Sequence, residues 1–135
     1  MRPPKSAARA QVTGVPVLSV AYGATVGERA VAGGFGLIVR FRLRDREAAA
    51  SFDALVARTL PEIARHEPGT LAYVVHAVPD EPLLRVFYEL YADRAAFDAH
   101  EQQPHTQRFL TQREDYLAGF EVTFLRGEAG FLPGV

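Results

Sequence analysis

The stretch TLAYVVHAVPDEPLLRVFYELY, residues 70–91, decides the fold of this 135-residue chain. Residues 70–78 and 83–91 are rich in β-branched and aromatic side chains, which is typical of β-strands. The segment between them, PDEP, has the composition of a turn. We therefore predict two adjacent antiparallel strands, because a hairpin is the shortest connection between them.

The segments that precede this hairpin predict a strand followed by a helix. FGLIVRFRL, residues 35–43, places alternate apolar side chains on one face, as a strand does. Asp45 is a candidate N-cap for an amphipathic helix that ends at Pro68-Gly69. Pro61 lies inside this helical pattern and predicts a kink or a second short helix there.

After the hairpin, the pattern predicts two further helical segments and a fourth strand. Asp93 is a candidate N-cap, and Pro104 fits the first turn of a following helix. We expect Gly119 to end that helix, with a strand over residues 120–126 and a loop in the tail, residues 127–135. Residues 1–34 form an N-terminal extension, for which an added edge strand at 15–22 and an unstructured segment are both open.

The resulting order β-α-β-β-α-β predicts an α+β, ferredoxin-like domain over residues 35–126. We expect an antiparallel four-stranded sheet with both helical segments packed on the same face. The hairpin strands, however, place apolar residues on both faces, for example Tyr73 and Val75 on one and Val74 on the other. Because an uncovered apolar face is unusual for a monomer, we expect a homodimer.

Composition excludes several classes of function. The formal net charge is -1, which gives no general attraction to nucleic acid or to an anionic membrane. The absence of cysteine excludes disulfides, thiolate nucleophiles and cysteine-bound zinc, and it fits a cytoplasmic location. No apolar run is long enough to predict a membrane span.

A series of residues in this order resembles the antibiotic-biosynthesis monooxygenase family of dimeric α/β-barrel proteins. The matching positions are Glu67-Pro68-Gly69, Glu89, Ala96-Phe97, His100 and Pro104-His105. The resemblance covers residues 35–126. It implies a dimeric α/β barrel and a cofactor-independent oxidation of an electron-rich aromatic, of quinol or anthrone type, by dioxygen.

One departure from the family pattern concerns the end of the third strand. Many relatives carry a tryptophan two residues after the strand glutamate, whereas Tyr91 stands there in this chain, which contains no tryptophan. The branch that degrades haem is therefore the one that this chain resembles least.

His100 and His105 are the candidates for proton transfer, since histidine changes its charge near neutral pH. Caps of helix ends, or hydrogen bonds to backbone carbonyls, are the structural alternative for both. A metal site is disfavoured, because residues five apart on one helix point in directions that differ by roughly 140°. Unless Pro104 bends the chain between them, the two histidines cannot share a metal, so we predict no metal; that no other cofactor is used is what the family resemblance implies.

Glu89 and Tyr91 are predicted as polar partners of these histidines in a pocket between the helices and the sheet. For Glu89, a structural ion pair with Arg40 or Arg42 is the competing interpretation. The residues expected to contact the aromatic substrate are Phe87, Phe97, Phe109, Tyr73 and His76. A buried structural role stays open for His76 and for the tyrosines.

Two other functions remain compatible with the sequence. An isomerase or cyclase that acts through an enolate would use the same base and hydrogen-bond donor without oxygen. A dimer that only binds a small ligand would need neither histidine for affinity.

Overall fold

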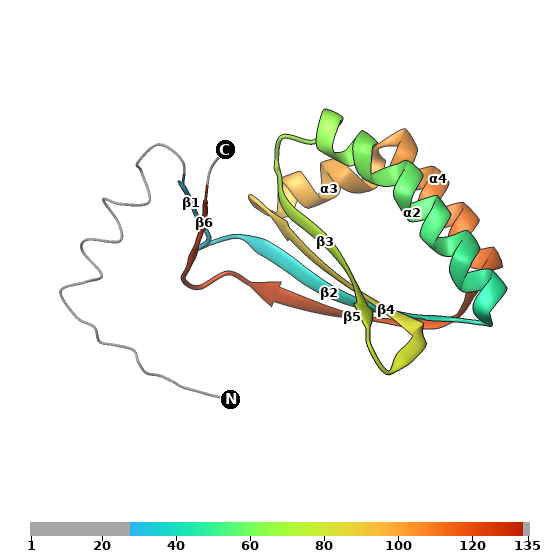
Figure 1. The fold of residues 1–135 in the computed structure, drawn as a ribbon. Coiled ribbons are helices and arrows are strands. Elements are labelled where there is room, and N and C mark those ends of the chain that lie inside the picture. The colour runs from blue at the N-terminus through green and yellow to red at the C-terminus, as the bar shows by residue number, and fades with distance from the viewer. Residues whose placement is uncertain (1–27, 134–135) are drawn as a thin grey trace. The chain divides into compact units, whose positions relative to one another are not determined.

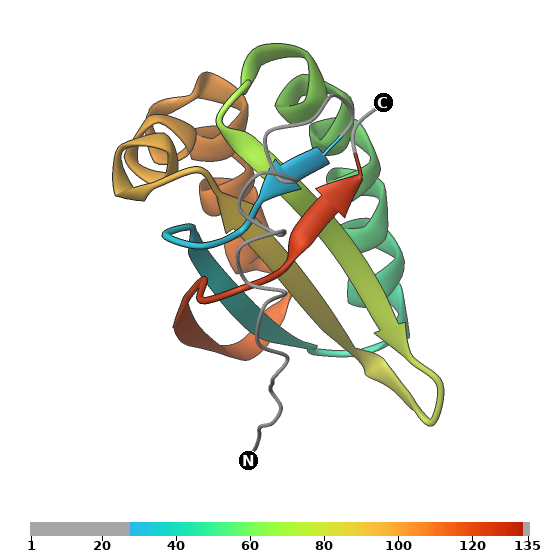
Figure 2. The same cartoon turned by 90° about the vertical axis from the view of Figure 1, so that its left-hand side faces the viewer.

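The computed structural model describes residues 28–133, which divide into two units. The larger unit, residues 33–128, consists of β2 (Phe35–Leu43), α2 (Arg46–His66), β3 (Thr70–Val78), β4 (Glu81–Tyr91), α3 (Arg94–Gln102), α4 (Pro104–Gln112), the 3-10 turn η2 (Arg113–Asp115) and β5 (Leu117–Arg126). In the smaller unit, β1 (Glu28–Ala30) pairs antiparallel with β6 (Phe131–Pro133), side by side in Figure 2. The tail predicted as loop thus contains a strand, and the strand considered at 15–22 lies outside the described residues.

The four strands of the larger unit form one antiparallel sheet in the order β3-β4-β2-β5. The helices α2, α3 and α4 all lie on one side of it (Figure 1). This arrangement confirms the predicted ferredoxin-like α+β fold. No helix among residues 28–133 is long and apolar enough to cross a membrane.

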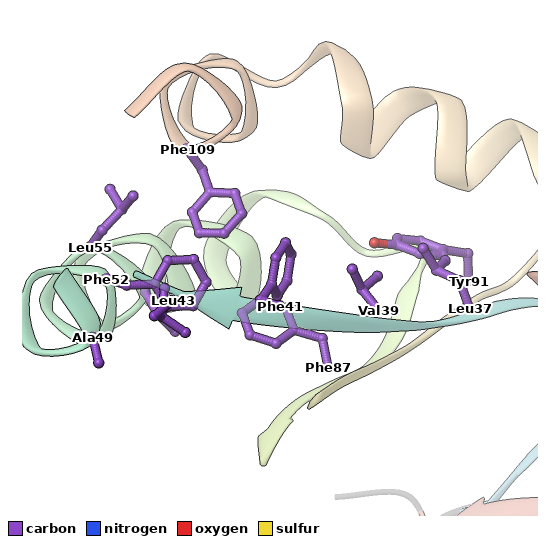
Figure 3. Packing of buried hydrophobic residues seen from close by; sticks show 11 residues of the cluster. Leu37, Val39, Phe41, Leu43, Ala49, Phe52, Leu55, Phe87, Tyr91 and Phe109 are labelled. Carbon is purple, nitrogen blue, oxygen red and sulfur yellow. The ribbon is translucent and has the colours of Figure 1, made fainter. Parts of the chain in front are cut away.

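The core lies between the helices and the centre of the sheet. Alternate residues of β2 point toward the helices, and Phe41 is the most deeply buried of them. Its ring packs on Phe52 of α2, with 5.2 Å between centroids, and on Phe87 of β4 at 4.7 Å. Phe109 of α4 points down toward Phe41 from the opposite helix (Figure 3). These aromatic contacts fix α2 and α4 over β2 and β4.

Helix α2 begins as predicted but is not broken at Pro61. The carboxylate of Asp45 accepts a hydrogen bond from the backbone N–H of Ala48 at 2.8 Å, which is an N-cap. The helix then continues to His66 without interruption. Pro61 and Ala57, four residues before it, are both exposed, so the carbonyl that Pro61 leaves unpaired can be hydrated. The second short helix, one of the two expectations at Pro61, is therefore not formed.

The helical segment after Pro104 is shorter than predicted. Helix α4 ends at Gln112, a 3-10 turn follows, and β5 already begins at Leu117. Gly119 lies inside that strand and pairs with Arg42 of β2, rather than ending a helix. Pairing with β2 supplies the backbone hydrogen bonds that a longer helix would otherwise have made.

Candidate functional site

A pocket of about 240 Å³ lies between the helical layer and the sheet. All four strands of the sheet contribute to it, together with α3, α4 and η2. Its wall is mostly aliphatic and aromatic, with a few polar groups, which is typical of a small-molecule site. The lining residues are Leu37, Val39, Phe41, Tyr73, Glu89, Phe97, His100, Glu101, Thr106, Phe109, Leu110, Arg113, Phe120, Val122 and Phe124.

A buried carboxylate, that of Glu67, joins both predicted histidines. Nδ1 of His100 lies 2.8 Å from Oε1 of Glu67, and Nε2 of His105 lies 2.5 Å from Oε2. The hydroxyl of Thr70 donates a third hydrogen bond to Oε1 at 2.7 Å. Because a carboxylate only accepts, each histidine nitrogen that faces it carries a proton. The three donors thus fix a His–Glu–His cluster.

The chain brings this cluster together by breaking the helix between the two histidines. His100 lies in the last turn of α3 and His105 in the first turn of α4, with extended backbone at Gln103 between them. Pro104 occupies the first turn of α4, as predicted. The divergence expected for a five-residue spacing on one helix therefore does not apply, and both rings reach the same carboxylate.

The electrostatics of Glu67 favour its ionised form. Burial acts to raise the pKa of this carboxyl, but the hydrogen bonds from His100, Thr70 and His105 outweigh burial and hold the pKa below its ordinary value. An ionised Glu67 keeps the proton of His100 on Nδ1. In the neutral imidazole, Nε2 is then the nitrogen that can accept a proton.

His100 is the member of the cluster that reaches the pocket. Its ring is packed among aromatic rings, 5.2 Å from Tyr91 and 5.8 Å from Tyr73 between centroids. His105 is equally buried but does not line the pocket. His105 can therefore act on a ligand only through Glu67.

Glu89 and Tyr91 form a second buried polar pair beside the cluster. The hydroxyl of Tyr91 donates a hydrogen bond to Oε1 of Glu89 at 2.6 Å. Burial raises the pKa of Glu89, although the Tyr91 hydrogen bond opposes this, and burial together with the Glu89 charge raises the pKa of Tyr91. The ion pair considered with Arg40 or Arg42 is not formed, because alternation along β2 places both arginines on the opposite face of the sheet.

The other predicted contact residues divide between the pocket and its surroundings. Tyr73, Phe97 and Phe109 line the pocket, whereas Phe87 is buried in the core behind it. His76 is exposed on the face of the sheet away from the helices, because it is paired with Val86 rather than with a pocket-facing residue. The structure therefore does not bring His76 to this site.

Sequence reasoning overlooked Glu67 and Arg113 as site residues. Glu67 belongs to the Glu-Pro-Gly motif, but its spacing gave no sign of contact with His100 and His105. These histidines follow it in the sequence by 33 and 38 residues. Arg113 appeared as one charge in the polar run QRED and gave no signal of its own. Within residues 28–133, no group of three or more His, Cys, Asp or Glu side chains has an arrangement that could hold a metal ion.

The chain is similar to known proteins in sequence and in structure. A 63-residue segment is 33% identical to the uncharacterised protein sll1783 of Synechocystis sp., and the match spans 47% of this chain and 43% of that relative. The structure of Rv0793 from Mycobacterium tuberculosis is similar with a TM-score of 0.62 and 28% identity, over 68% of this chain and 92% of that one.

A further similar structure is that of a mutant form of SnoaB, described as a cofactor-independent oxygenase from Streptomyces nogalater. It has a TM-score of 0.62 and 22% identity, over 71% of this chain and 94% of that one. A family model described as antibiotic biosynthesis monooxygenase matches residues 34–112, more than half of the chain. On that match, the chain belongs to the antibiotic biosynthesis monooxygenase family.

Proposed function

We propose that this protein is a cofactor-independent monooxygenase that oxidises a quinol-type aromatic with dioxygen. The observation that carries the proposal is the pair of Glu67 and His100, in which a buried carboxylate orients an imidazole at the wall of an aromatic pocket. SnoaB, which has a similar fold, is described as a cofactor-independent oxygenase, and that description agrees with the reaction proposed for this chain.

His100 is the proposed base. With Nδ1–H donating to Glu67, Nε2 of the neutral ring takes the proton from a phenolic hydroxyl of the substrate. The imidazolium that forms is stabilised by the Glu67 carboxylate. The resulting phenolate is electron-rich enough to pass an electron to dioxygen, and the two radicals combine at a ring carbon to give a peroxide, which takes the proton from the imidazolium. The proton on that ring carbon is then lost and the O–O bond breaks, so that one oxygen atom stays in the product, a hydroxyquinone, and the other leaves as water.

Tyr73 is the proposed donor to the developing oxyanion. It lines the pocket, and its ring lies next to that of His100. Burial, with the nearby charges of Glu89 and Glu67, raises the pKa of Tyr73 well above its ordinary value. The hydroxyl therefore keeps its proton and can donate a hydrogen bond to the oxyanion.

The size of the pocket favours a substrate of one or two fused rings. A cavity of about 150 Å³ accommodates benzene. The volume of about 240 Å³ is larger by roughly one additional ring and is smaller than most drug-sized sites. A naphthalene-sized quinol therefore fits better than a larger polycyclic compound.

The proposal predicts that 1,4-dihydroxynaphthalene is turned over with consumption of oxygen. Labelled dioxygen should place one heavy oxygen atom in the product, as measured by mass spectrometry. His100→Gln should lower kcat about 100-fold or more, because a positioned base contributes about 10²–10⁴. His76→Gln is the matched control, since His76 is an exposed histidine on the face of the sheet away from the pocket.

Three results would contradict this proposal. Turnover without oxygen uptake indicates the enolate isomerase or cyclase, and binding without turnover indicates a ligand-binding protein. A bound flavin or haem spectrum in the purified, active protein would contradict its independence of cofactors.

We further propose that two copies pair through the face of the sheet opposite the helices. That face carries Val74, which is 43% exposed, and the half-buried Ile38, Val86 and Tyr88. A second copy would remove these apolar side chains from water.

A further inference from the structure

Arg113 places a cation in the aromatic end of the pocket. It lies in the 3-10 turn η2, between α4 and β5. Its guanidinium carbon is 4.7 Å from the ring centroid of Phe120 and 5.5 Å from that of Phe41. The guanidinium also lies 5.9 Å from the ring centroid of Phe109. Three aromatic rings therefore surround one charge.

These rings do not satisfy the hydrogen-bonding capacity of Arg113. Among residues 28–133, no carboxylate forms an ion pair with it, and its buried Nε–H has no hydrogen-bond partner. Cation–π contacts use the flat face of the guanidinium, whereas its N–H groups lie in the plane. Burial lowers the pKa of Arg113, which reflects the free-energy cost of a poorly compensated charge.

We infer that the ligand of this pocket is an aromatic acid, whose anionic group binds the Arg113 guanidinium while its phenolic hydroxyl faces His100. This inference rests on the proposed function and specifies the class of substrate. An oxyanion in the guanidinium plane would supply the acceptor that the protein lacks, and such charge-assisted pairs are among the stronger hydrogen bonds.

The register of the sheet places the two polar groups at opposite ends of the pocket. Leu37 of β2 pairs with Glu89, beside the His–Glu–His cluster, whereas Phe41 pairs with Phe120, beside Arg113. Leu37 and Phe41 are four residue steps apart along the strand, or about 13 Å between Cα atoms. The hydroxyl and the acidic group must therefore lie at opposite ends of the ligand.

Two carboxylates line the same pocket and restrict where an anion can bind. Glu89 lies at the His100 end, and Glu101 projects from α3. Neither forms an ion pair with Arg113 within the part of the chain that the structure describes. A carboxylate next to the reacting hydroxyl would face these charges instead of the guanidinium, so the position of the acid on the ring should affect affinity strongly.

The test compares three naphthols that differ only in the acid and its position. Their dissociation constants are measured by fluorescence titration with the whole chain. 6-Hydroxy-2-naphthoate, with its groups at opposite ends, should bind about tenfold or more tightly than 2-naphthol. 3-Hydroxy-2-naphthoate, with adjacent groups, should show no such gain.

Variants assign the effect to Arg113. Arg113→Met keeps most of the apolar stem and should remove the preference for 6-hydroxy-2-naphthoate while leaving 2-naphthol affinity within about twofold. Arg108→Met, at an exposed arginine of α4, should change neither constant. Thermal unfolding of Arg113→Met should show no large loss of stability, because the buried charge has no ionic partner to leave behind.

The outcomes separate this inference from the proposed function. Equal affinity for 2-naphthol and 6-hydroxy-2-naphthoate, or a preference that survives in Arg113→Met, overturns the aromatic-acid inference and leaves the oxygenase proposal intact. Failure of all three compounds to bind also overturns the aromatic-acid inference, whereas oxygen uptake with 1,4-dihydroxynaphthalene decides the oxygenase proposal separately.

Discussion

At the scale of single residues, two buried carboxylates of this protein have opposite electrostatic environments. Glu67 accepts three hydrogen bonds, and its pKa is held below the ordinary value. Glu89 accepts one from Tyr91, and burial raises its pKa. The surroundings of Glu67 therefore stabilise its anionic form, whereas those of Glu89 destabilise its anionic form.

For Glu67, the sign of the shift determines how stability depends on pH. A carboxyl whose pKa is lower in the folded state stabilises the protein above its ordinary pKa of about 4.3, and this contribution is lost as pH falls through the folded value. Glu67→Gln should reduce the free energy of unfolding at pH 7 by about 1–3 kcal/mol, because the amide cannot accept from both histidines. Urea unfolding between pH 3 and pH 7 measures this.

The deficit of Glu67→Gln should shrink as the pH falls below about 4.3, where the carboxyl takes up its proton in the unfolded state, and should vanish once the pH passes the lower pKa of the folded state. Glu114→Gln, at an exposed carboxylate of η2, serves as the control and should match the wild type throughout. A deficit that stays constant across the pH range would contradict the assignment of Glu67 as the ionised centre of the cluster.

For Glu89, the contribution to stability should depend on pH in the opposite direction. Its folded pKa is raised, so stability is fully present below the ordinary pKa and is lost as pH rises toward the folded value. Glu89→Gln keeps an oxygen that can accept from Tyr91 but carries no charge. It should raise the melting temperature at pH 7 by about 2–5 °C, have no effect near pH 4, and lower activity. A lower melting temperature at pH 7 would refute this account.

At the scale of secondary-structure elements, α3 packs directly on the turn that follows Glu67. A Cβ atom at Gly69 would lie 2.7 Å from the Cβ of Ala96 in α3, and the backbone N–H of Ala92 donates to the Gly69 carbonyl at 2.9 Å. Helix α3, which carries His100, thus packs directly against the backbone of Gly69. The absence of a side chain at this one position sets the distance between the Glu67 turn and α3.

A methyl group at Gly69 should therefore displace α3. Gly69→Ala is expected to reduce the free energy of unfolding by about 1–3 kcal/mol, as other overpacked sites do, and to weaken binding of 2-naphthol by moving His100. Gly119→Ala is the matched control, because no atom lies within 4 Å of a Cβ built there. Calorimetry and fluorescence titration measure the two effects, and equal behaviour of both variants would exclude the steric explanation.

At the scale of the whole molecule, exposed apolar side chains occur on both faces of the sheet. Val74 lies on the face away from the helices, but Phe120 at 47%, Val122 at 39% and Phe124 at 60% exposure lie on the helix side of β5. Sequence alternation had directed attention to the outer face alone. The helices pack over the other strands, so the inner face of the edge strand β5 remains open at the mouth of the pocket.

The proposed dimer can be tested without disturbing the single chain. Val74 is exposed, so Val74→Arg places its charge in water in a monomer but in the apolar contact of a dimer. We expect sedimentation velocity to show a dimer for the wild type and a monomer for Val74→Arg. Ala57→Arg, on the exposed side of α2, should remain dimeric. A wild-type chain that is monomeric at high concentration would refute pairing through this face.

Local chemistry made most of the fold predictable. The strands at 35–43 and 70–78 were predicted to the residue, and both aspartate N-caps are confirmed, since Asp45 and Asp93 each accept from a backbone N–H at 2.8 Å. These features depend on side-chain alternation and on hydrogen bonds within four residues. The errors at Pro61 and Gly119 arose where solvent access or pairing with a distant strand overrode local preference.

The sequence by itself determined the order of strands and helices, because periodicity and capping act over a few residues. It also identified His100 and His105 as candidates, through the family resemblance and the proton chemistry of histidine. Only the tertiary structure decided that Glu67 would join both histidines, that Glu89 would pair with Tyr91 rather than with an arginine, and that Arg113 would enter the pocket. These contacts depend on strand register and on helix placement, which bring together groups that are far apart along the chain.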